Sequence, residues 1–176
     1  MQAAGITLVL GGARSGKSAV AERLVASAAG DDPVAYLATG PVPDPAADPS
    51  WAARVAAHRT RRPAAWRTIE VGDGQLGPAL LAAEETVLVD SLGTWLAGFG
   101  PDASAELLAA LEARRTSGRT SVVVSEEVGL GVHPSTALGG AFRDALGELN
   151  QAVAGAADDV LLVVAGRVLP LLPGTP

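Results

Sequence analysis

Apolar runs and amphipathic stretches alternate along the chain, and this alternation predicts strands that alternate with helices. Short runs rich in valine, isoleucine and leucine are typical of buried parallel strands, and one more polar run predicts an additional short strand. The predicted strands are residues 6–10, 34–38, 66–71, 86–90, 120–125 and 159–165. Helical spacing of apolar positions predicts helices at residues 18–25, 50–61, 76–83, 91–96, 102–115 and 136–156.

This order of elements indicates an α/β fold with a mostly parallel central sheet and helices on both faces. Asp48 followed by Pro49 predicts the start of the second helix, and Asp102 predicts an N-cap for the fifth. The segment after residue 165 contains several prolines, so we expect a tail that frays at its tip. The chain shows neither an internal repeat nor an interdomain linker, and residues 1–176 are expected to form a single domain.

The segment between the first predicted strand and the first predicted helix matches the phosphate-loop pattern G-x-x-x-x-G-K-[ST]. Glycines let backbone N–H groups approach phosphate oxygens, and the helix N-terminus adds partial positive charge. In this pattern Lys17 reaches the β- and γ-phosphates, and the Ser18 hydroxyl ligates Mg²⁺. An ordinary glycine-rich turn that caps a helix is the alternative interpretation. The predicted phosphate-binding residues are Gly11, Gly12, Ala13, Arg14, Ser15, Gly16, Lys17 and Ser18.

Lys17 is the only lysine among the 13 lysine and arginine residues of the chain. The chain therefore keeps lysine at the one position where a compact point charge suits a phosphate better than the planar fork of arginine. This observation favours the phosphate loop over the ordinary turn.

Composition restricts the classes of function. The net charge of −6 argues against nucleic-acid binding through a broadly basic surface. The chain has no cysteine, which excludes disulfides, a thiolate nucleophile and a thiolate metal site. We find neither a secretory signal pattern nor an apolar run long enough to cross a membrane, so a cytoplasmic protein without membrane insertion is expected.

Polar residues follow the predicted strands at their carboxyl ends, where ligands bind in open α/β sheets. Thr39 and Gly40 follow the second strand, although a structural turn explains them equally well. Asp90 ends a buried strand and has the form of a Walker B acid, which predicts a carboxylate on the Mg²⁺ side of the phosphate loop. Glu126 and Glu127 end another strand, where either a site or a simple turn is possible.

The second predicted helix gathers much of the basic charge of this acidic chain. Arg54 and His58 are four residues apart and share a face, and Arg59, Arg61 and Arg62 crowd the C-terminal end. One interpretation is a solvated helix end whose cations complement the helix dipole. The other is an anion site that contains a histidine able to act as a nucleophile near neutral pH.

Several motifs together resemble the bifunctional adenosylcobinamide kinase / adenosylcobinamide-phosphate guanylyltransferase family of cobalamin biosynthesis. The phosphate loop is shared by many families, whereas the pattern R-x-x-x-H-R-x-x-R-P followed by W-x-T-x-E is far more specific. The pattern E-V-G-x-G, followed by F-R-D and N-Q, is equally specific. The matching segments are residues 11–18, 36–39, 54–63, 66–70, 89–96, 127–132 and 142–154, which span nearly the whole chain in the order of the family.

The resemblance implies a RecA-like P-loop fold, often a homotrimer, that acts in two steps. A nucleoside triphosphate, GTP or ATP, first phosphorylates the hydroxyl of adenosylcobinamide. GTP then guanylylates the histidine matched by His58, and GMP passes to adenosylcobinamide phosphate to give adenosylcobinamide-GDP. Lys17 and Mg²⁺, the latter held by Ser18 and Asp90, would stabilise the departing pyrophosphate.

The resemblance also assigns roles around the nucleotide. Arg59, Arg61 and Arg62 would hold phosphate or guanosine, and the Glu70 carboxylate would accept hydrogen bonds from guanine. The remaining nucleotide contacts that it implies are Thr39, Gly40, Thr60 and Asp90.

The chain departs from the usual family pattern at several positions. Glu126 stands in place of an asparagine, Gly140 in place of an arginine, and Ser91 in place of a common cysteine. Glu126 and Gly140 could signal an altered substrate preference or the loss of one activity. Two rival functions also stay open, a plain P-loop small-molecule kinase and a regulatory GTP-binding protein. Neither rival needs His58 together with Arg62 and Glu70.

Overall fold

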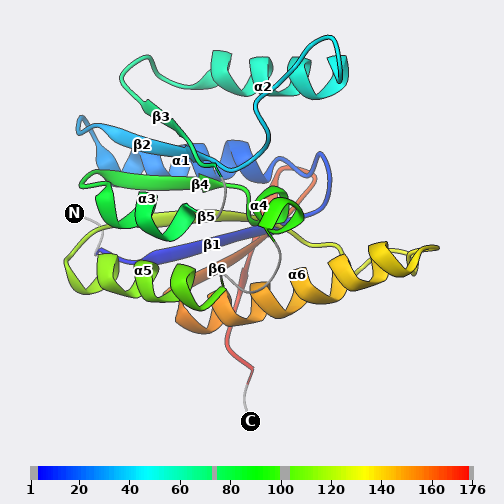
Figure 1. Cartoon of the computed structure of the whole chain (residues 1–176). Coiled ribbons are helices and arrows are strands. Elements are labelled where there is room, and N and C mark those ends of the chain that lie inside the picture. The colour runs from blue at the N-terminus through cyan, green and yellow to red at the C-terminus, as the bar shows by residue number, and fades with distance from the viewer. Residues whose placement is uncertain (1–3, 73–74, 100–103, 175–176) are drawn as a thin grey trace.

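In the computed structural model, one seven-stranded sheet is enclosed between helices (Figure 1). The structure describes residues 4–72, 75–99 and 104–174. The strands are β1 (Ile6–Gly11), β2 (Val34–Ala38), β3 (Arg67–Glu70), β4 (Thr86–Asp90), β5 (Ser121–Glu126), β6 (Asp159–Val164) and β7 (Arg167–Leu171). The helices are α1 (Lys17–Ala29), α2 (Pro49–Arg61), α3 (Leu76–Ala82), α4 (Leu92–Phe99), α5 (Ser104–Thr116) and α6 (Ala137–Ala156).

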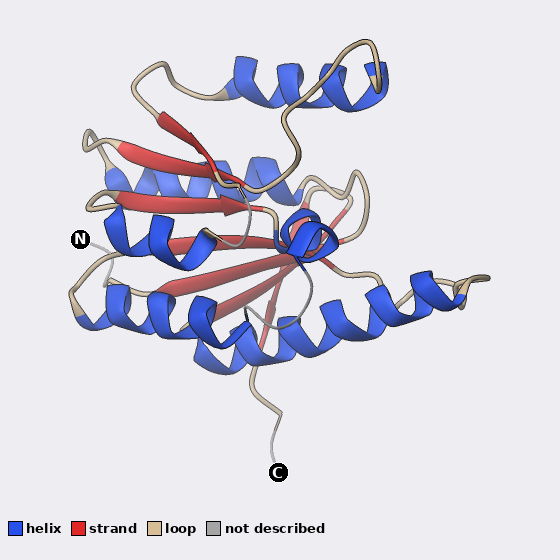
Figure 2. Ribbon diagram, viewed as in Figure 1, coloured by secondary structure: helices blue, strands red, loops and turns tan. Residues whose placement is uncertain are grey.

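The strand order is β3-β2-β4-β5-β1-β6-β7. Neighbouring strands from β3 to β6 pair in parallel, and β7 alone among the described strands runs antiparallel, beside β6. This arrangement confirms the predicted mostly parallel sheet. The carboxyl ends of β1, β2, β4 and β5 consequently meet at one edge of the sheet (Figure 2). The polar residues singled out in the sequence follow these ends along the chain.

Helices cover both faces of the sheet, as the sequence predicts. On one face α1 packs with Val20, Ala21 and Val25 against the buried side chains of β1, β2, β4 and β5. On the other face α3, α4, α5 and α6 enclose the larger core cluster, which includes the buried Trp95. The helix α2 differs from these helices, because none of its residues, all of which the structure describes, is buried.

The sequence did not predict β7, which residues 167–171 form within the segment that was expected to be a tail with a frayed tip. Pro170 lies within this strand and cannot donate a ladder hydrogen bond. Because β7 is an edge strand that pairs on one side with β6, the missing N–H is tolerated.

The predicted N-cap Asp102 lies outside the described residues. Within the described residues, the structure has no helix of the length and apolar character needed to span a bilayer.

A buried arginine ties the elements of the larger core together. Arg114 on α5 is 1% exposed. Burial lowers the pKa of Arg114 to about 10, so its guanidinium stays charged at neutral pH. That guanidinium donates hydrogen bonds to the carbonyls of Leu80, Ala83, Glu85 and Thr120 and to Ser121 Oγ. It thereby satisfies carbonyl groups at the end of α3 and at the starts of β4 and β5.

Replacing Arg114 should destabilise the fold strongly. We expect Arg114→Met to lower the free energy of unfolding by about 3 kcal/mol or more, because it leaves several buried carbonyls without a donor. Urea denaturation followed by circular dichroism measures this loss. The matched control is Arg115→Met, since Arg115 is exposed and pairs with Glu112 at the surface. Equal urea midpoints for the two variants would contradict the role assigned to Arg114.

Candidate active site

The phosphate loop connects the buried strand β1 to the start of α1. Gly16 has φ 93° and Arg14 has φ 56°, so the loop turns through left-handed conformations. A Cβ at Gly11 would lie 2.5 Å from Ser15 Oγ and 2.7 Å from the carbonyl oxygen of Val163, which explains why glycine is needed there. This loop geometry agrees with a phosphate cradle at the N-terminus of a helix.

Lys17 is 4% exposed, and its ammonium lies close to two oxygen atoms. Lys17 Nζ lies 3.5 Å from the carbonyl oxygen of Gly12 and 3.4 Å from Glu126 Oε1. Because β5 lies between β1 and β4, Glu126 at the end of β5 lies nearer to this lysine than the sequence alone indicated. We propose that a bound polyphosphate would compete with the Glu126 carboxylate for Lys17.

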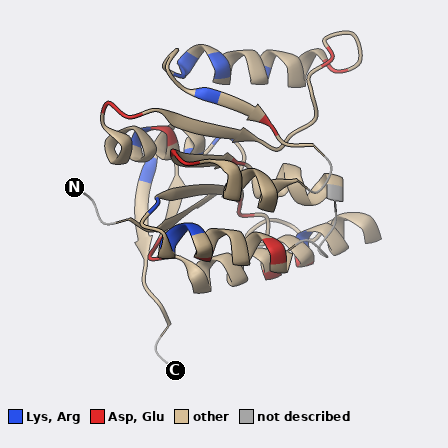
Figure 3. Ribbon diagram, turned by 60° about the vertical axis from the view of Figure 1, so that its left-hand side comes forward, with Lys and Arg blue, Asp and Glu red and all other residues tan. Residues whose placement is uncertain are grey.

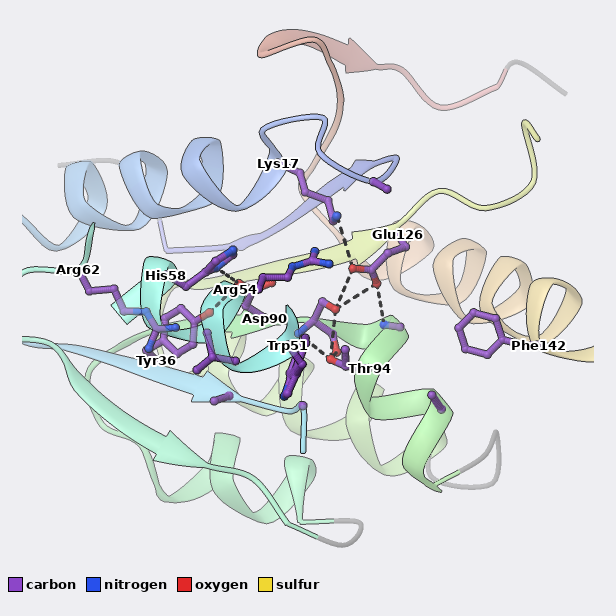
Figure 4. Close-up of a pocket in the computed structure, with 17 residues that line it drawn as sticks. Lys17, Tyr36, Trp51, Arg54, His58, Arg62, Asp90, Thr94, Glu126 and Phe142 are labelled. Carbon is purple, nitrogen blue, oxygen red and sulfur yellow. Dashed lines mark hydrogen bonds and ion pairs between the residues drawn. The ribbon is translucent and has the colours of Figure 1, made fainter. Parts of the chain in front are cut away.

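Three further contacts hold the Glu126 carboxylate. Ser91 Oγ lies 3.0 Å from both carboxylate oxygens, and the backbone N–H of Gly93 donates to Oε2 at 3.1 Å. A Cβ at position 93 would collide with this carboxylate, so the absence of a side chain at Gly93 leaves room for Glu126 in this position. Glu126, which replaces the asparagine of the family pattern, is thus fixed in a defined position beside the phosphate loop (Figure 4).

Surface contacts position α2 above the site. The Asp48 side chain accepts a hydrogen bond from the backbone N–H of Trp51, which confirms the predicted N-cap. The indole N–H of Trp51 donates to the carbonyl of Pro41, and a Cβ at Gly40 would lie 2.5 Å from the indole ring. Glycine at position 40 therefore allows the N-terminal end of α2 to approach the loop after β2.

At the C-terminal half of α2, His58 contacts the carboxylate that ends β4. His58 Nδ1 lies 3.5 Å from Asp90 Oδ2, and the Tyr36 hydroxyl donates to the same oxygen at 2.6 Å. The Arg62 guanidinium lies 3.2 Å from the centre of the Tyr36 ring, as in a cation–π contact. Four residues, His58 on α2, Asp90 on β4, Tyr36 on β2 and Arg62 directly after α2, thus form one continuous row.

The pKa values in this row agree with an ionised Asp90. Burial by itself would raise the pKa of Asp90, but hydrogen bonds from His58 and Tyr36 outweigh burial and lower the pKa below its ordinary value. Burial and the neighbouring carboxylate raise the pKa of the Tyr36 phenol far above its ordinary value. Tyr36 therefore remains a hydrogen-bond donor over the whole physiological range of pH.

Two cavities adjoin at α2. The first, of about 320 Å³, lies between Asp90, Glu126 and the aromatic rings of Tyr36, Trp51 and Phe142. The second, of about 590 Å³, lies between the phosphate loop and α2. Lys17, Arg54 and His58 line both cavities. The geometry therefore places the candidate nucleophile and two cations where the cavities meet.

Basic residues lie along α2 and directly after it (Figure 3), and their side chains have different neighbours. Arg61 lines the cavity beside the phosphate loop and forms two hydrogen bonds with Glu22 on α1. Arg62 lines the first cavity. Arg59 pairs with Glu70 at 2.7 Å, and neither residue is among those that line the two cavities.

The two predicted threonine contacts have local partners. Thr60 is exposed, and its hydroxyl donates to the carbonyl of Ala56 one turn earlier in α2. Thr39 is 3% exposed and donates to the carbonyl of Ser91 at 2.6 Å. The structure therefore places Thr39 behind the site, where it supports the segment after Asp90, while Gly40 lines the first cavity.

The sequence placed Arg54 on the same helix face as His58 without giving it a specific role, and it gave no role in the site to Tyr36 or Trp51. Arg54 forms no hydrogen bond or ion pair with the described residues, and its side chain extends toward Lys17 and Glu126 (Figure 4). Its spacing of four residues from His58 was a usable signal. No signal in the sequence indicated the contact of Tyr36 with Asp90, because a tyrosine in an apolar strand is also typical of a plain core position.

The donor set fits a magnesium ion that arrives with a nucleotide. Mg²⁺ in such sites binds one or two protein oxygens together with substrate phosphates and waters. Ser18 lines the cavity beside the phosphate loop. Both contacts of the Asp90 carboxylate use Oδ2, so that Oδ1 has no partner among the described residues. The described residues contain no cluster of three or more His, Cys, Asp or Glu that would hold a metal without substrate.

Comparison with known proteins gives a match over most of the chain. A family model described as cobinamide kinase / cobinamide phosphate guanyltransferase matches residues 7–171. The bifunctional adenosylcobalamin biosynthesis protein CobP of Pseudomonas aeruginosa is 39% identical over 171 residues, with 93% of this chain and 95% of that protein covered. CobU of Salmonella typhimurium, with the same description, is 38% identical over 180 residues, with 90% and 95% covered.

A solved structure supports the fold class. The flagellar accessory protein FlaH from Methanocaldococcus jannaschii superposes with a TM-score of 0.58 at 12% identity. The match covers 94% of this chain and 75% of FlaH. The predicted RecA-like P-loop architecture is confirmed, and the likeness concerns the fold alone.

The contact between Lys17 and Glu126 generates a prediction about nucleotide affinity. We expect Glu126→Gln to tighten GTP binding in metal-free buffer by roughly five- to tenfold, because it removes a negative charge beside the phosphates; like charges at such distances repel by about 1 kcal/mol even in water. Isothermal titration calorimetry measures the Kd. Glu127→Gln is the matched control, since that carboxylate accepts a hydrogen bond from the backbone of Gly129 and lines neither cavity. Weaker binding by Glu126→Gln would contradict the competition proposed for Lys17.

Proposed function

The chain belongs to the cobinamide kinase / cobinamide phosphate guanyltransferase family, and we propose that its two adjoining cavities serve the two reactions of that family. It is a bifunctional enzyme of cobalamin biosynthesis. It phosphorylates adenosylcobinamide with a nucleoside triphosphate and then transfers GMP from GTP to adenosylcobinamide phosphate. The observation that carries the assignment of the site is that Lys17, Arg54 and His58 line both cavities.

We propose that His58 carries the GMP between the two substrates. An imidazole nitrogen of His58 attacks the α-phosphorus of GTP, a P–N bond forms, and the bond to the leaving pyrophosphate breaks. A phosphate oxygen of adenosylcobinamide phosphate then attacks the same phosphorus, and the P–N bond breaks. Covalent catalysis of this kind divides a difficult transfer into two easier steps. Because His58 lines both cavities, one side chain can accept the nucleotide from one cavity and release it toward the other.

The other residues around the cavities bind and neutralise phosphate. The backbone of the phosphate loop and the Lys17 ammonium stabilise the charge on the departing pyrophosphate. Ser18 Oγ and Asp90 Oδ1 would hold Mg²⁺, which would offset further charge on the phosphates. Arg61 and Arg62 are proposed to contact phosphate or ribose, with Gly40 at the rim.

We propose that Glu70, which lies outside the two cavities, recognises the guanine base. Its carboxylate stands at the carboxyl end of β3, is 41% exposed and has Arg59 as its partner in the structure. A carboxylate that accepts hydrogen bonds from guanine discriminates against bases that lack these donors. Arg59, the partner of Glu70, lies on α2, and Thr60 is the next residue of that helix.

We further propose that the enzyme is a homotrimer in the cytoplasm, where nucleoside triphosphates are available. The free edge of β7 supports self-association, because Val168, Leu169 and Leu171 are exposed along it. An exposed edge strand with apolar side chains is a template for contacts with another chain.

The guanylyl-histidine proposal predicts a defined covalent product. Incubation of the protein with GTP and Mg²⁺, without cobinamide, should add one GMP that is lost in acid, and His58→Ala should abolish this addition. Intact-mass spectrometry measures the adduct. His133→Ala is the matched control, because His133 is the other histidine of the chain and lies in the exposed segment before α6, where it contacts Arg143. An unmodified wild-type protein that still binds GTP would favour the plain kinase or the regulatory protein.

The guanidinium of Arg54, which has no partner among the described residues, gives a second prediction. Arg54→Gln should slow formation of the GMP adduct on the order of 100-fold, because one preorganised donor to the developing phosphate charge is lost. Rapid-quench sampling followed by intact-mass analysis gives the rate. Arg67→Gln is the control, since Arg67 pairs with Glu85 and lines neither cavity. An unchanged rate in Arg54→Gln would place Arg54 outside the reaction.

A further inference from the structure

We propose that Asp90 is a positioning residue for His58: its carboxylate holds the N–H at Nδ1 and thereby directs the lone pair of Nε2 to the phosphorus. This proposal rests on the proposed role of His58 as the GMP carrier. The sequence indicated a role for Asp90 as a magnesium ligand, because it ends a buried strand in the manner of a Walker B acid. The positioning of His58 would be a second role of the same carboxylate.

The geometry selects one nitrogen of the imidazole. Nδ1 of His58 faces Asp90 Oδ2 at 3.5 Å, so Nε2 is the nitrogen left for the reaction. The Asp90 side chain is 11% exposed and that of His58 is 19% exposed, which limits competition from water for this contact. A carboxylate beside one ring nitrogen favours the tautomer with the proton on that nitrogen.

The contacts around Asp90 fix the position of its carboxylate. Asp90 is the last residue of β4, and β2 and β5 flank it on both sides in the sheet. The Tyr36 hydroxyl donates to Oδ2 at 2.6 Å, and Tyr36 itself is 2% exposed. Arg62 covers the tyrosine ring and donates to Thr68 Oγ1 at 3.2 Å, so the row ends on β3. A row supported by three adjacent strands can hold the imidazole of His58 in one orientation more firmly than α2, a helix without buried residues, could alone.

The chemistry of the transfer needs such a partner. When the Nε2 lone pair forms the P–N bond, the imidazole becomes positively charged while the proton on Nδ1 stays in place. The nearby carboxylate stabilises this charge without taking up the proton, as in other histidine–carboxylate pairs. When GMP leaves, the electron pair of the P–N bond returns to Nε2, and the neutral tautomer is restored. No further reactant is needed for the cycle.

The two oxygens of the carboxylate separate the two roles of Asp90. Both protein contacts use Oδ2, and Oδ1 is left for a metal ion or its water. One acid at the end of β4 can therefore face the histidine and the nucleotide phosphates at the same time. A residue that served only as a metal ligand would leave the tautomer of His58 in the metal-free protein unaffected.

The test reads the tautomer directly in the protein without nucleotide and without metal. The full-length chain is labelled with ¹⁵N-histidine, and long-range ¹H–¹⁵N spectra are recorded at a pH where the imidazoles are neutral. The chain has two histidines, so His133→Gln identifies the signals of His58. We expect Nδ1 of His58 to be protonated and Nε2 to be unprotonated in the wild type.

Variants of Asp90 complete the test. In Asp90→Asn, the tautomer should shift toward Nε2–H, and formation of the GMP adduct should slow at least tenfold. Asp90→Glu restores a carboxylate at the end of β4 and should recover the Nδ1–H tautomer. Tyr36→Phe keeps the Asp90 carboxylate and should keep the tautomer of the wild type.

The outcomes separate this inference from the proposed function. A wild-type His58 with its proton on Nε2 would overturn the positioning role, and so would an Asp90→Asn variant with an unchanged tautomer. If Asp90→Asn did not fold, the spectra of the wild type, Tyr36→Phe and Asp90→Glu would still show whether the Asp90 carboxylate sets the tautomer of His58. If the wild type showed the expected tautomer but formed no GMP adduct, the carrier role of His58 would fail while the hydrogen bond stood.

Discussion

The parallel direction of β1, β2, β4 and β5 is the constraint on which the site depends. Since these strands end at one edge, residues that are far apart in the sequence meet there: the phosphate loop after β1, Gly40 after β2, Asp90 on β4 and Glu126 on β5. The hydrophobic clusters on both faces hold the strands in this order. The positions of the site residues thus depend on this core, from which Tyr36 reaches the carboxylate of Asp90.

Much of this arrangement could be predicted from the sequence. The limits of β2 and β4 agree with their predicted ranges, and those of the other predicted strands differ by a residue at one or both ends. Hydrophobic runs and glycine or proline breaks are local signals, and they are strong in this chain. The phosphate loop, His58 and Asp90 could also be located, because each lies in a motif whose spacing carries chemical meaning.

What the sequence did not reveal depends on neighbours in space. The strand order places β5 between β1 and β4, and so it places Glu126 rather than Asp90 beside Lys17. Strand order is decided by packing over the whole sheet, which no local pattern records. The strand β7 was missed for a related reason, because Pro170 argues against a strand unless it is known to lie at an edge. The hydrogen bonds of Arg114 could not be predicted either, because most of their acceptors are near Arg114 in space but far from it in the sequence.

The surface placement of α2 has a consequence for the energetics of the enzyme. Charged and polar pairs hold this helix to the body, among them Arg61 with Glu22 and Arg59 with Glu70, and none of the residues of α2, all of them described, is buried as an anchor. Exposed ion pairs are typically worth about 0–1 kcal/mol each, whereas burial of one large apolar side chain contributes roughly 1.5–3 kcal/mol. A displacement of α2 therefore replaces its surface ion pairs by contacts with water, and the hydrophobic core stays intact. Because His58 lies on this helix, moving it relative to the phosphate loop costs little free energy. This cost should also depend on ionic strength, since salt screens the surface ion pairs.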